Sequence, residues 1–392
     1  MVVVVDTLRR DALGVYGASR STPAIDGIAA RGRVYRHFAA SFHQTSMSMG
    51  ALFTGRVPSI ESGDPARPLP WTGQTWCGMS RLAKAGDAHC VPESLPTLAE
   101  AMRDAGYWTI GIASNDFLHA NSGYDRGFDD WVQVGLLAPG GSPSAPRAAS
   151  RARRWERVHE AIVVALARRP RERLFLYVHY MDAHDWTIAG TDYASAVARA
   201  DAGVGALLEH LEATGLAAGA VVILTSDHGE RIAETHPPFF KPKPGHLGNP
   251  SFQELLEIPL IIAPDVGPES DVPRRSHDLF HEIRALAGLE PTTNTELESD
   301  ELFLGELHTR TYRRGRWKSA MSRRGGVPLL FDLATDPGEQ RNVAAEHPDV
   351  VAAHRARMDG LTAALATTRA TRADLEPDER KRLRALGYLE ED

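Results

Sequence analysis

A short apolar run that ends in Asp-His-Gly restricts the fold of this chain more than any other segment. Residues 219–230 read GAVVILTSDHGE, and the run at 220–224 is rich in β-branched side chains. Such a run is typical of a strand that is buried on both faces of a parallel sheet. Asp227 and His228 follow it, where open α/β sheets bind their ligands. A carboxylate and an imidazole can hold a divalent cation, although the same residues also form ordinary polar turns.

Strand and helix patterns alternate along the chain as far as about residue 290. Further buried strands are predicted at 2–5, 107–113, 174–178 and 260–263. Helices are predicted at 23–31, 46–54, 95–105, 154–168, 193–214 and 278–287. Ser94 is the candidate N-cap of the third helix. This alternation predicts an α/β fold with a doubly wound, mostly parallel sheet flanked by helices.

The pattern changes towards the C-terminus. Short antiparallel strands and a terminal helix are predicted at 308–311, 317–322, 329–332 and 349–365. We therefore predict a catalytic domain at 1–300 and a small C-terminal subdomain, an antiparallel sheet plus helix with a charged tail, at 301–392. Residues 57–91 are rich in Pro, Gly, Ser and Trp, which predicts a long surface excursion. Residues 138–150 are of low complexity.

Composition and charge exclude several classes of function. The chain has 392 residues and a net charge of −7, which favours neither nucleic acid nor an anionic membrane as partner. No apolar run is long enough to predict a transmembrane segment. No signal peptide is recognisable, so the chain as written is expected to be cytoplasmic. A start further upstream is left open, because the first strand begins at the first residue. Cys77 and Cys90 do not settle the compartment.

Polar residues follow four of the predicted strands. Asp6, Asn115 and the pair Asp227 and His228 each come directly after a strand, and residues 179–184 place two histidines at the end of another. Ligands of open α/β sheets bind at the carboxyl ends of the strands. We therefore expect these residues to converge on one site, although they lie far apart in the chain.

Thr45 stands at the start of a predicted helix, where free backbone N–H groups and the helix dipole favour an anion. A threonine hydroxyl is a poor nucleophile unless a base or a metal ion lowers its pKa. A cation held by Asp6, Asp227 and His228 would do so, and it would also neutralise charge that grows on ester oxygens. Thr45 is thus a candidate nucleophile for a phosphate or sulfate ester, with a plain helix N-cap as the alternative.

On these motifs the chain resembles the sulfatase family within the alkaline phosphatase superfamily. The matching segments keep the family's order and cover most of the chain, and the most specific in combination are DTLR-x-D, TSDHGE and LFDLATDPGEQRN. The resemblance implies a single divalent cation held by Asp6, Asp227, His228 and the nucleophile, which falls on Thr45. A site of oxygen ligands with one imidazole admits Ca²⁺, Mg²⁺, Mn²⁺ or Zn²⁺.

The chain departs from the family at the nucleophile. Sulfatases carry Cys or Ser there, which is converted to formylglycine, with Pro two positions later and Arg four positions later. Here Thr45, Met47 and Met49 take these three places. Threonine cannot become formylglycine, so the resemblance to superfamily relatives with a Thr nucleophile implies a phosphate ester and a phospho-threonine intermediate. Asn115 stands where many sulfatases have Lys, and Thr7 where many relatives have a second metal-binding Asp.

Further residues complete the predicted site. His184 resembles the family's histidine that contacts the ester or leaving group, and an imidazole suits a general acid near neutral pH. His246 is a second candidate acid, with a surface loop histidine as the alternative. Asn115, Arg9 and Lys243 are candidate substrate contacts. The alternatives are a partner for a core carboxylate in the case of Arg9 and a solvated basic loop in the case of Lys243.

The sequence therefore predicts a metal-dependent hydrolase of the sulfatase-like class that cleaves a phosphate, phosphonate or sulfate ester through Thr45. One alternative is a conventional sulfuric ester hydrolase. Another is a non-catalytic protein that keeps the fold and binds a metal or an anion, which the altered segment TSMSM favours. The expected partner is a small anionic ester, and the oligomeric state is left open.

Overall fold

The structure is a computed structural model. It describes residues 1–58, 91, 95–115, 117–118, 123–134, 154–168, 173–236, 245–246, 250–266, 274–290, 292, 296–306 and 309–364. The predictions for Ser94, Lys243, both cysteines, residues 138–150 and most of 57–91 lie outside the described residues. No helix within the described ranges combines the length and apolarity that crossing a bilayer requires.

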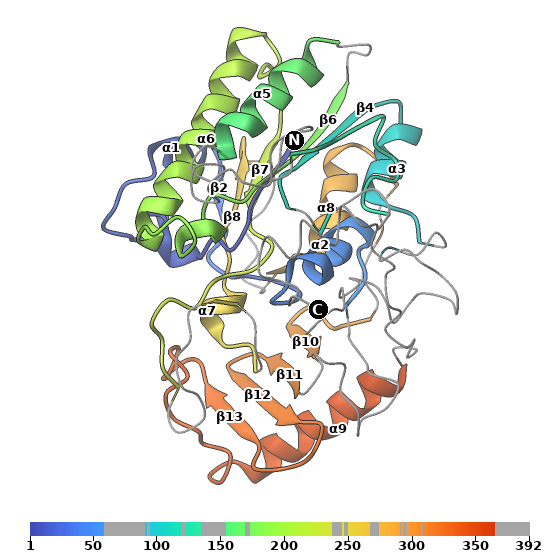
Figure 1. Ribbon diagram of the computed structural model, residues 1–392. Helices are drawn as coiled ribbons and strands as arrows, with labels where there is room; N and C mark the ends of the chain where they lie inside the picture. Colours follow the sequence, from blue (N-terminus) through green and yellow to red (C-terminus); the bar gives the residue numbers. More distant parts are fainter. Residues whose placement is uncertain are drawn as a thin grey trace, which may run out of the picture.

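A seven-stranded sheet forms the centre of the larger part of the molecule (Figure 1). The strand order is β2-β8-β7-β1-β6-β4-β5, with bounds Val2–Val5 (β1), Arg33–Val34 (β2), Trp108–Ala113 (β4), Asp130–Gln133 (β5), Leu174–Tyr180 (β6), Val222–Thr225 (β7) and Leu260–Ala263 (β8). β1 lies between β6 and β7 and is parallel to both, with Val4 opposite His179 and Thr225. β8 is antiparallel to β7 and β2, so the sheet is mostly parallel, as predicted.

Helices cover both faces of this sheet. One face packs against α1 (Pro23–Ala29), α5 (Arg154–Leu166) and α6 (Tyr193–Ala213), and the other against α2 (Thr45–Thr54), α3 (Leu98–Asp104) and α8 (Asp278–Leu286). Figure 1 shows the two groups on opposite sides of the strands. In β1, Val3 and Val5 join the first core and Val2 and Val4 the second, because successive side chains alternate across a strand. This confirms the predicted doubly wound α/β fold.

The start of α3 differs from the prediction. The helix begins at Leu98, and Thr97 rather than Ser94 is its N-cap. Oγ1 of Thr97 accepts the N–H of Glu100 at 3.1 Å, and the Glu100 carboxylate accepts the N–H of Thr97 at 2.8 Å. This reciprocal capping box satisfies two N–H groups that would otherwise lack partners at the helix end. The sequence already contained its signature in Thr-x-x-Glu.

Shorter elements connect the main ones. They are β3 (Phe38–Ala39), β9 (Arg274–Arg275), α7 (Gln253–Leu256) and the 3-10 turns η1 (Arg10–Ala12), η2 (Gly14–Tyr16) and η5 (His184–Trp186). α7 lies directly against the loop that follows β7. A Cβ at Gly229 would collide with the backbone carbonyl of Glu254, and the N–H of Gly229 donates to the carbonyl of Leu255 at 2.9 Å. Glycine after Asp-His is therefore required by this close approach.

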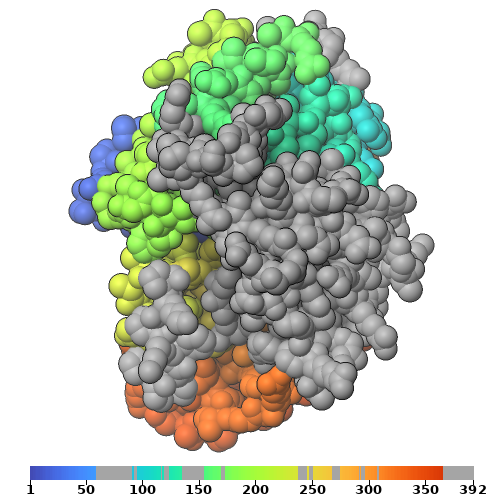
Figure 2. Space-filling view, viewed as in Figure 1, coloured from blue at the N-terminus to red at the C-terminus, as the bar shows by residue number. Residues whose placement is uncertain are grey.

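A four-stranded antiparallel sheet and a long helix form the C-terminal part, drawn in orange and red in Figures 1 and 2. Their bounds are Glu301–Gly305 (β10), Thr309–Arg314 (β11), Trp317–Ser322 (β12), Leu329–Asp332 (β13) and Pro348–Ala364 (α9). The last two strands were predicted, β11 is longer than predicted, and β10 was not predicted. Phe303, Tyr312, Leu330 and Met358 share one buried cluster that joins this sheet to α9. The predicted domain boundary at residue 300 stays a prediction.

Candidate metal and nucleophile site

Residues that are far apart in the sequence meet at the carboxyl ends of β1, β7 and β4. Asp6 follows β1, Asp227 and His228 follow the loop residue after β7, and Asn115 follows β4 by two positions. Each is at most 2% exposed. One carboxylate oxygen each of Asp6 and Asp227 and one ring nitrogen of His228 all lie within 4.8 Å of one another. The structure thus brings together the three residues that we expected to share a cation.

Each of these three residues has an atom available to a ligand. Oδ1 of Asp6 and Oδ2 of Asp227 are buried without a hydrogen-bond partner among the described residues. Nδ1 of His228 lies 2.9 Å from the carbonyl oxygen of Gly229, so Nδ1 carries the ring proton and Nε2 keeps its lone pair. That Nε2 lies 3.3 Å from Oδ2 of Asp227. Two lone-pair atoms repel at this distance unless a cation lies between them, so the donor set fits a divalent cation.

Thr45 is the first residue of α2, and its hydroxyl contacts this cluster. Oγ1 lies 3.4 Å from Oδ2 of Asp6 and 3.4 Å from Nε2 of His228. Nδ2 of Asn115 donates to the same Oγ1 at 3.2 Å. Gln44, not Thr45, is the N-cap residue, and it makes no side-chain capping bond. The Thr45 hydroxyl therefore faces the ligand cluster, which differs from the plain N-cap interpretation.

The second oxygen of Asp6 is held by two donors. Oδ2 accepts Nδ2 of Asn115 at 2.7 Å and pairs with Nε2 of His179 at 3.0 Å. Burial acts most strongly on the pKa of Asp6 and would raise it. The His179 hydrogen bond and the nearby histidine charges outweigh burial and hold that pKa well below its ordinary value. Asp6 is therefore an ionised carboxylate with one oxygen fixed and the other open. Burial lowers the pKa of His228, which favours the neutral, ligating imidazole.

The hydrogen-bond partners that support His179 were not predicted from the sequence. Nδ1 of His179 lies 2.8 Å from the hydroxyl of Tyr177, and that hydroxyl lies 3.2 Å from Sδ of Met49. Tyr177 and His179 are two residues apart on β6, so their side chains share one face of the sheet. The spacing Tyr-x-His was an available signal for the pair. The partner Met49, at the family's arginine position, becomes visible only once α2 is packed on that face.

Asp227 is oriented by backbone groups. Its Oδ1 accepts the N–H of Thr7 at 3.0 Å and the N–H of His228 at 2.8 Å. Thr7 has a φ of +57°, and its hydroxyl donates to the carbonyl of Asp6 at 2.7 Å. This left-handed turn brings the loop after β1 onto Asp227. Thr7 stands where many relatives have a second metal-binding Asp, and here it stabilises the turn.

His184 begins η5 and has an acidic neighbour. Its Nδ1 lies 3.0 Å from Oδ1 of Asp185. Burial acts to lower the pKa of His184, but the Asp185 hydrogen bond and the charges of Asp6, Asp185 and Glu230 raise it to about 9. Without a bound cation, the imidazole is therefore protonated at neutral pH.

His246 lies against the cluster and not on the surface. It is 9% exposed, and its ring centroid lies 4.5 Å from that of His228 and 5.3 Å from that of His184. Its Nδ1 lies 3.6 Å from a carboxylate oxygen of Glu230. This position differs from the surface-histidine alternative and is compatible with contact to a substrate.

Arg9 is engaged by acceptors of the protein itself. Its guanidinium binds Asp11 at 2.7 Å, Glu234 at 2.5 Å and the carbonyl oxygen of Glu230 at 3.0 Å. This arrangement matches the alternative in which Arg9 is a partner for carboxylates. Lys243, the other predicted basic contact, lies outside the described residues.

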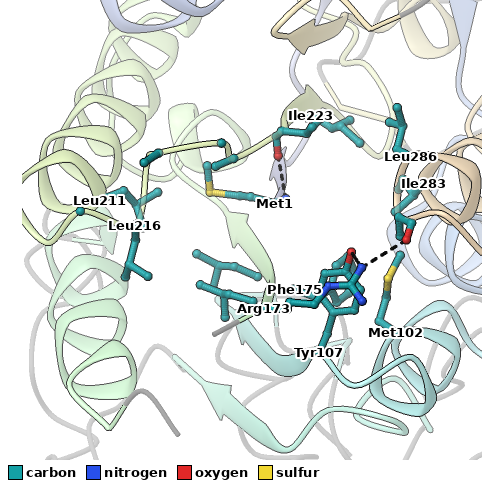
Figure 3. A pocket seen from close by; sticks show the side chains of 18 residues that line it. Met1, Met102, Tyr107, Arg173, Phe175, Leu211, Leu216, Ile223, Ile283 and Leu286 are labelled. Atoms are coloured by element: carbon teal, nitrogen blue, oxygen red, sulfur yellow. Dashed lines mark hydrogen bonds between the residues drawn. The ribbon is translucent and has the colours of Figure 1, made fainter. Parts of the chain in front are cut away.

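A cavity of about 350 Å³ lies at the other end of the strands (Figure 3). The side chains that line it are mostly apolar and come from the amino ends of β1, β6 and β7 and from the helices beside them, including Met1, Phe175, Leu211, Ile223 and Leu286. Arg173 stacks on the ring of Tyr107 at 4.0 Å along one side. The cavity contains none of the predicted site residues among those that line it, so it is separate from the candidate site.

A family model described as Sulfatase matches residues 1–289. Arylsulfatase K of Rattus norvegicus is 27% identical over 189 residues, which are 40% of this chain and 32% of that relative. N-acetylgalactosamine-6-sulfatase of Sus scrofa is 26% identical over 371 residues, which are 80% of this chain and 67% of that relative. The chain thus spans about a third of the length of the first relative.

Solved structures share the fold. A crystal structure of the phosphonate monoester hydrolase of Agrobacterium radiobacter matches with a TM-score of 0.66 at 17% identity, over 93% of this chain and 95% of the other. At this level of identity the likeness concerns the fold alone, and the chemistry has to be argued from the site.

Proposed function

Because the chain belongs to the sulfatase family, we propose that it is a metal-dependent hydrolase in which Thr45 attacks a phosphate, phosphonate or sulfate ester. The observation that carries the proposal is the position of Oγ1 of Thr45, 3.4 Å from both Oδ2 of Asp6 and Nε2 of His228. A hydroxyl beside a buried set of unfilled ligand atoms has the surroundings that a metal-activated nucleophile needs.

We assign the cation to Oδ1 of Asp6, Oδ2 of Asp227 and Nε2 of His228, with Oγ1 of Thr45 as a further donor. Such a set accepts Ca²⁺, Mg²⁺, Mn²⁺ or Zn²⁺. When bound, the cation supplies positive charge that lowers the pKa of a neighbouring hydroxyl and offsets charge on ester oxygens. The lowered pKa of Asp6 supports this assignment, because the carboxylate is already ionised and a cation does not have to displace a proton from it.

The side chains of this protein carry the group transfer. Oγ1 of Thr45 forms a bond to phosphorus or sulfur while the bond to the leaving oxygen breaks, and its proton passes to water. Protonated His184 gives a proton to the leaving oxygen, and Asn115 orients Thr45 through its hydrogen bond. In the second half, neutral His184 takes a proton from water, which attacks the Thr45 ester. Thr45 regains a proton from water as the acid product leaves.

Phosphorus is the preferred centre. Threonine cannot be converted to formylglycine, so the hydrated-aldehyde route of sulfatases is closed to Thr45. A phosphomonoester, phosphodiester or phosphonate ester then fits the nucleophile better than a sulfate ester. The other predicted contacts are ranked by their surroundings: Asn115 and His246 lie at the cluster, whereas Arg9 is already paired with carboxylates. Lys243 stays a proposed contact on sequence grounds.

Two other functions have an observation in their favour. A conventional sulfuric ester hydrolase is favoured by the names of the two curated relatives described above, which are sulfatases. A non-catalytic binding protein is favoured by Met47 and Met49, which are fully buried where the family has Pro and Arg. The loss of that Arg removes a charge that usually supports the nucleophile.

The test compares aryl phosphate, phosphodiester, phosphonate and sulfate substrates with added Mn²⁺, Ca²⁺, Mg²⁺ or Zn²⁺. We expect metal-dependent hydrolysis of a phosphorus ester by the wild type, and loss of about 10³-fold or more in Thr45→Ala and Asp227→Asn. Thr45→Ser is the matched control, because it keeps a hydroxyl, and it should retain most of the activity.

Each contrary outcome selects another function. Equal turnover in Thr45→Ala would remove the nucleophile assignment. Turnover of sulfate esters alone would favour the conventional sulfatase. Metal binding by calorimetry without turnover of any ester would favour the binding protein.

A further inference from the structure

A buried series of ionic contacts connects α5 to His184. Oδ1 of Asp185 lies 3.0 Å from Nδ1 of His184, and Oδ2 of Asp185 lies 3.0 Å from Nη1 of Arg154, the first residue of α5. The side chains of Asp185 and Arg154 are each 3% exposed. Neither residue is among the site residues that the sequence predicted.

These ionic contacts restrict the protonation and the orientation of the His184 ring. An ionised carboxylate accepts hydrogen bonds only, so the Nδ1 that faces Asp185 carries a proton. A buried carboxylate needs a compensating charge, which the Arg154 guanidinium provides. The imidazole is thereby held in one orientation, with Nε2 as the nitrogen that exchanges protons with a ligand.

We propose that Asp185, held by Arg154, is a positioning residue that fixes the orientation of His184 and stabilises its imidazolium form. The inference rests on the proposed function, in which His184 protonates the leaving oxygen. In that step the Nε2–H bond breaks, the leaving oxygen gains the proton, and its bond to phosphorus breaks. Nδ1 keeps its proton, and Asp185 stays ionised throughout.

Several titratable or charged groups face His184 from the surrounding elements. They are Asp6 after β1, Glu230 after β7, Asp185 in η5 itself and the ring of His246, with Arg154 behind Asp185. Asp185 differs from the other acids because it acts on His184 through both a hydrogen bond and its charge. Its removal is therefore expected to lower the pKa of His184, whereas Asp6 and Glu230 would still act through their charges.

Asp201 offers a matched control. It is a buried aspartate on α6 that accepts the N–H groups of Ala24 and Ile25 at 3.2 and 2.9 Å, at the start of α1. Its replacement by Asn also removes a buried carboxylate, but one that serves only the fold. A general loss of stability would therefore affect both variants, and an effect on proton transfer only one.

The experiment measures kcat for a series of aryl phosphate or phosphonate esters, from dinitrophenyl to phenyl, with the full chain and its activating cation. Asp185→Asn should lose on the order of 10²-fold with the phenyl ester and little with the dinitrophenyl ester, because only a poor leaving group needs an acid. Asp201→Asn should keep the wild-type dependence. NMR titration of His184 without substrate should give a lower pKa in Asp185→Asn and an unchanged one in Asp201→Asn.

An unchanged leaving-group dependence and an unchanged His184 titration in Asp185→Asn would overturn the inference, while wild-type turnover would leave the proposed function standing. If the wild type binds metal and hydrolyses no ester, the proposed function fails, and the catalytic part of the inference fails with it. The NMR comparison then still decides whether Asp185 holds the His184 proton. If Asp185→Asn does not fold, the double variant Asp185→Asn/Arg154→Gln avoids an unpaired guanidinium and must show the same steeper dependence.

Discussion

The two carboxylate oxygens of Asp6 have different roles in the site. One of its oxygens accepts from Asn115 and pairs with His179, and the other has no partner among the described residues. Asp227 has the same arrangement, since two backbone N–H groups donate to Oδ1 and Oδ2 has no hydrogen-bond partner among the described residues. Two buried carboxylates with one open oxygen each repel one another, and a cation would relieve that repulsion.

Metal addition should therefore stabilise the protein. We expect Mn²⁺ at about 100 times its Kd to add about 2.7 kcal/mol to the free energy of unfolding, because it binds only the folded site. Asp227→Asn should remove this gain, and Asp201→Asn should keep it. Thermal melting with and without Mn²⁺ measures both. A wild-type melting temperature that no divalent cation changes would contradict the metal assignment.

The activity should fall at alkaline pH. The pKa of His184 is raised to about 9, so the imidazolium that protonates the leaving group predominates below that value and is lost above it. A cation bound beside Asp6 opposes the upward shift, so we expect the alkaline limb of kcat between about 6.5, the ordinary histidine value, and about 9. A pH profile with a phenyl ester measures it. A rate that continues to rise above this range would exclude His184 as the acid.

At the scale of elements, the first residues of α2 and α3 have different roles, one in the candidate site and the other in stabilising the helix. Every residue of α2 is buried, and its first residue presents the hydroxyl to the site. α3 instead uses its first turn for a capping box between Thr97 and Glu100. A helix start therefore indicates a site only when its polar side chain has partners beyond the helix.

Thr97→Ala should lower the free energy of unfolding by about 1 kcal/mol, the usual cost of losing an N-cap. Thr97→Ser should lose little, because serine also accepts the N–H of Glu100. Urea unfolding of the two variants measures the difference. Equal losses in both would show that the threonine methyl group, and not the cap, stabilises this end of α3.

At the scale of the whole molecule, buried polar pairs connect the C-terminal sheet to the larger part. Nζ of Lys318 in β12 lies 2.7 Å from Oε1 of Glu339, and Oε2 of Glu339 accepts the N–H of Gln253 in α7 at 2.6 Å. His43, two residues before Thr45, lies 3.2 Å from Glu306 at the end of β10. The C-terminal part is thus linked to the segment that carries the nucleophile.

Lys318→Met should cost about 3–5 kcal/mol, because it leaves the buried Glu339 carboxylate without its cation. The double variant Lys318→Met/Glu339→Gln should recover part of that loss. Arg341→Ala removes an ion pair whose side chains are 69% and 51% exposed, and it should leave stability unchanged within error. Chemical denaturation compares the three. A Lys318→Met variant as stable as Arg341→Ala would contradict the stabilising role of this buried pair.

The fold was most predictable where a short apolar run forms a central strand of the mostly parallel sheet. β1 and β8 have the predicted bounds, because a run of four apolar residues rich in β-branched side chains is typical of a strand that is buried on both faces. β10 was not predicted, because its sequence ELFLG stays ambiguous until β11 pairs with it. The antiparallel direction of β8 likewise depends on its neighbours β7 and β2 and not on its own residues.

By itself the sequence determined which residues stand at the ends of the buried strands. It therefore supported the expectation that Asp6, Asp227 and His228 would meet, since parallel strands present their carboxyl ends at one edge. Only the tertiary structure decided which side chains support the site residues from neighbouring elements. Arg154 reaches Asp185 and Met49 reaches Tyr177 only because α5 and α2 pack on opposite faces of the sheet. Hydrogen-bond partners depend on distances between side chains of different elements, and those distances are set when the elements pack together.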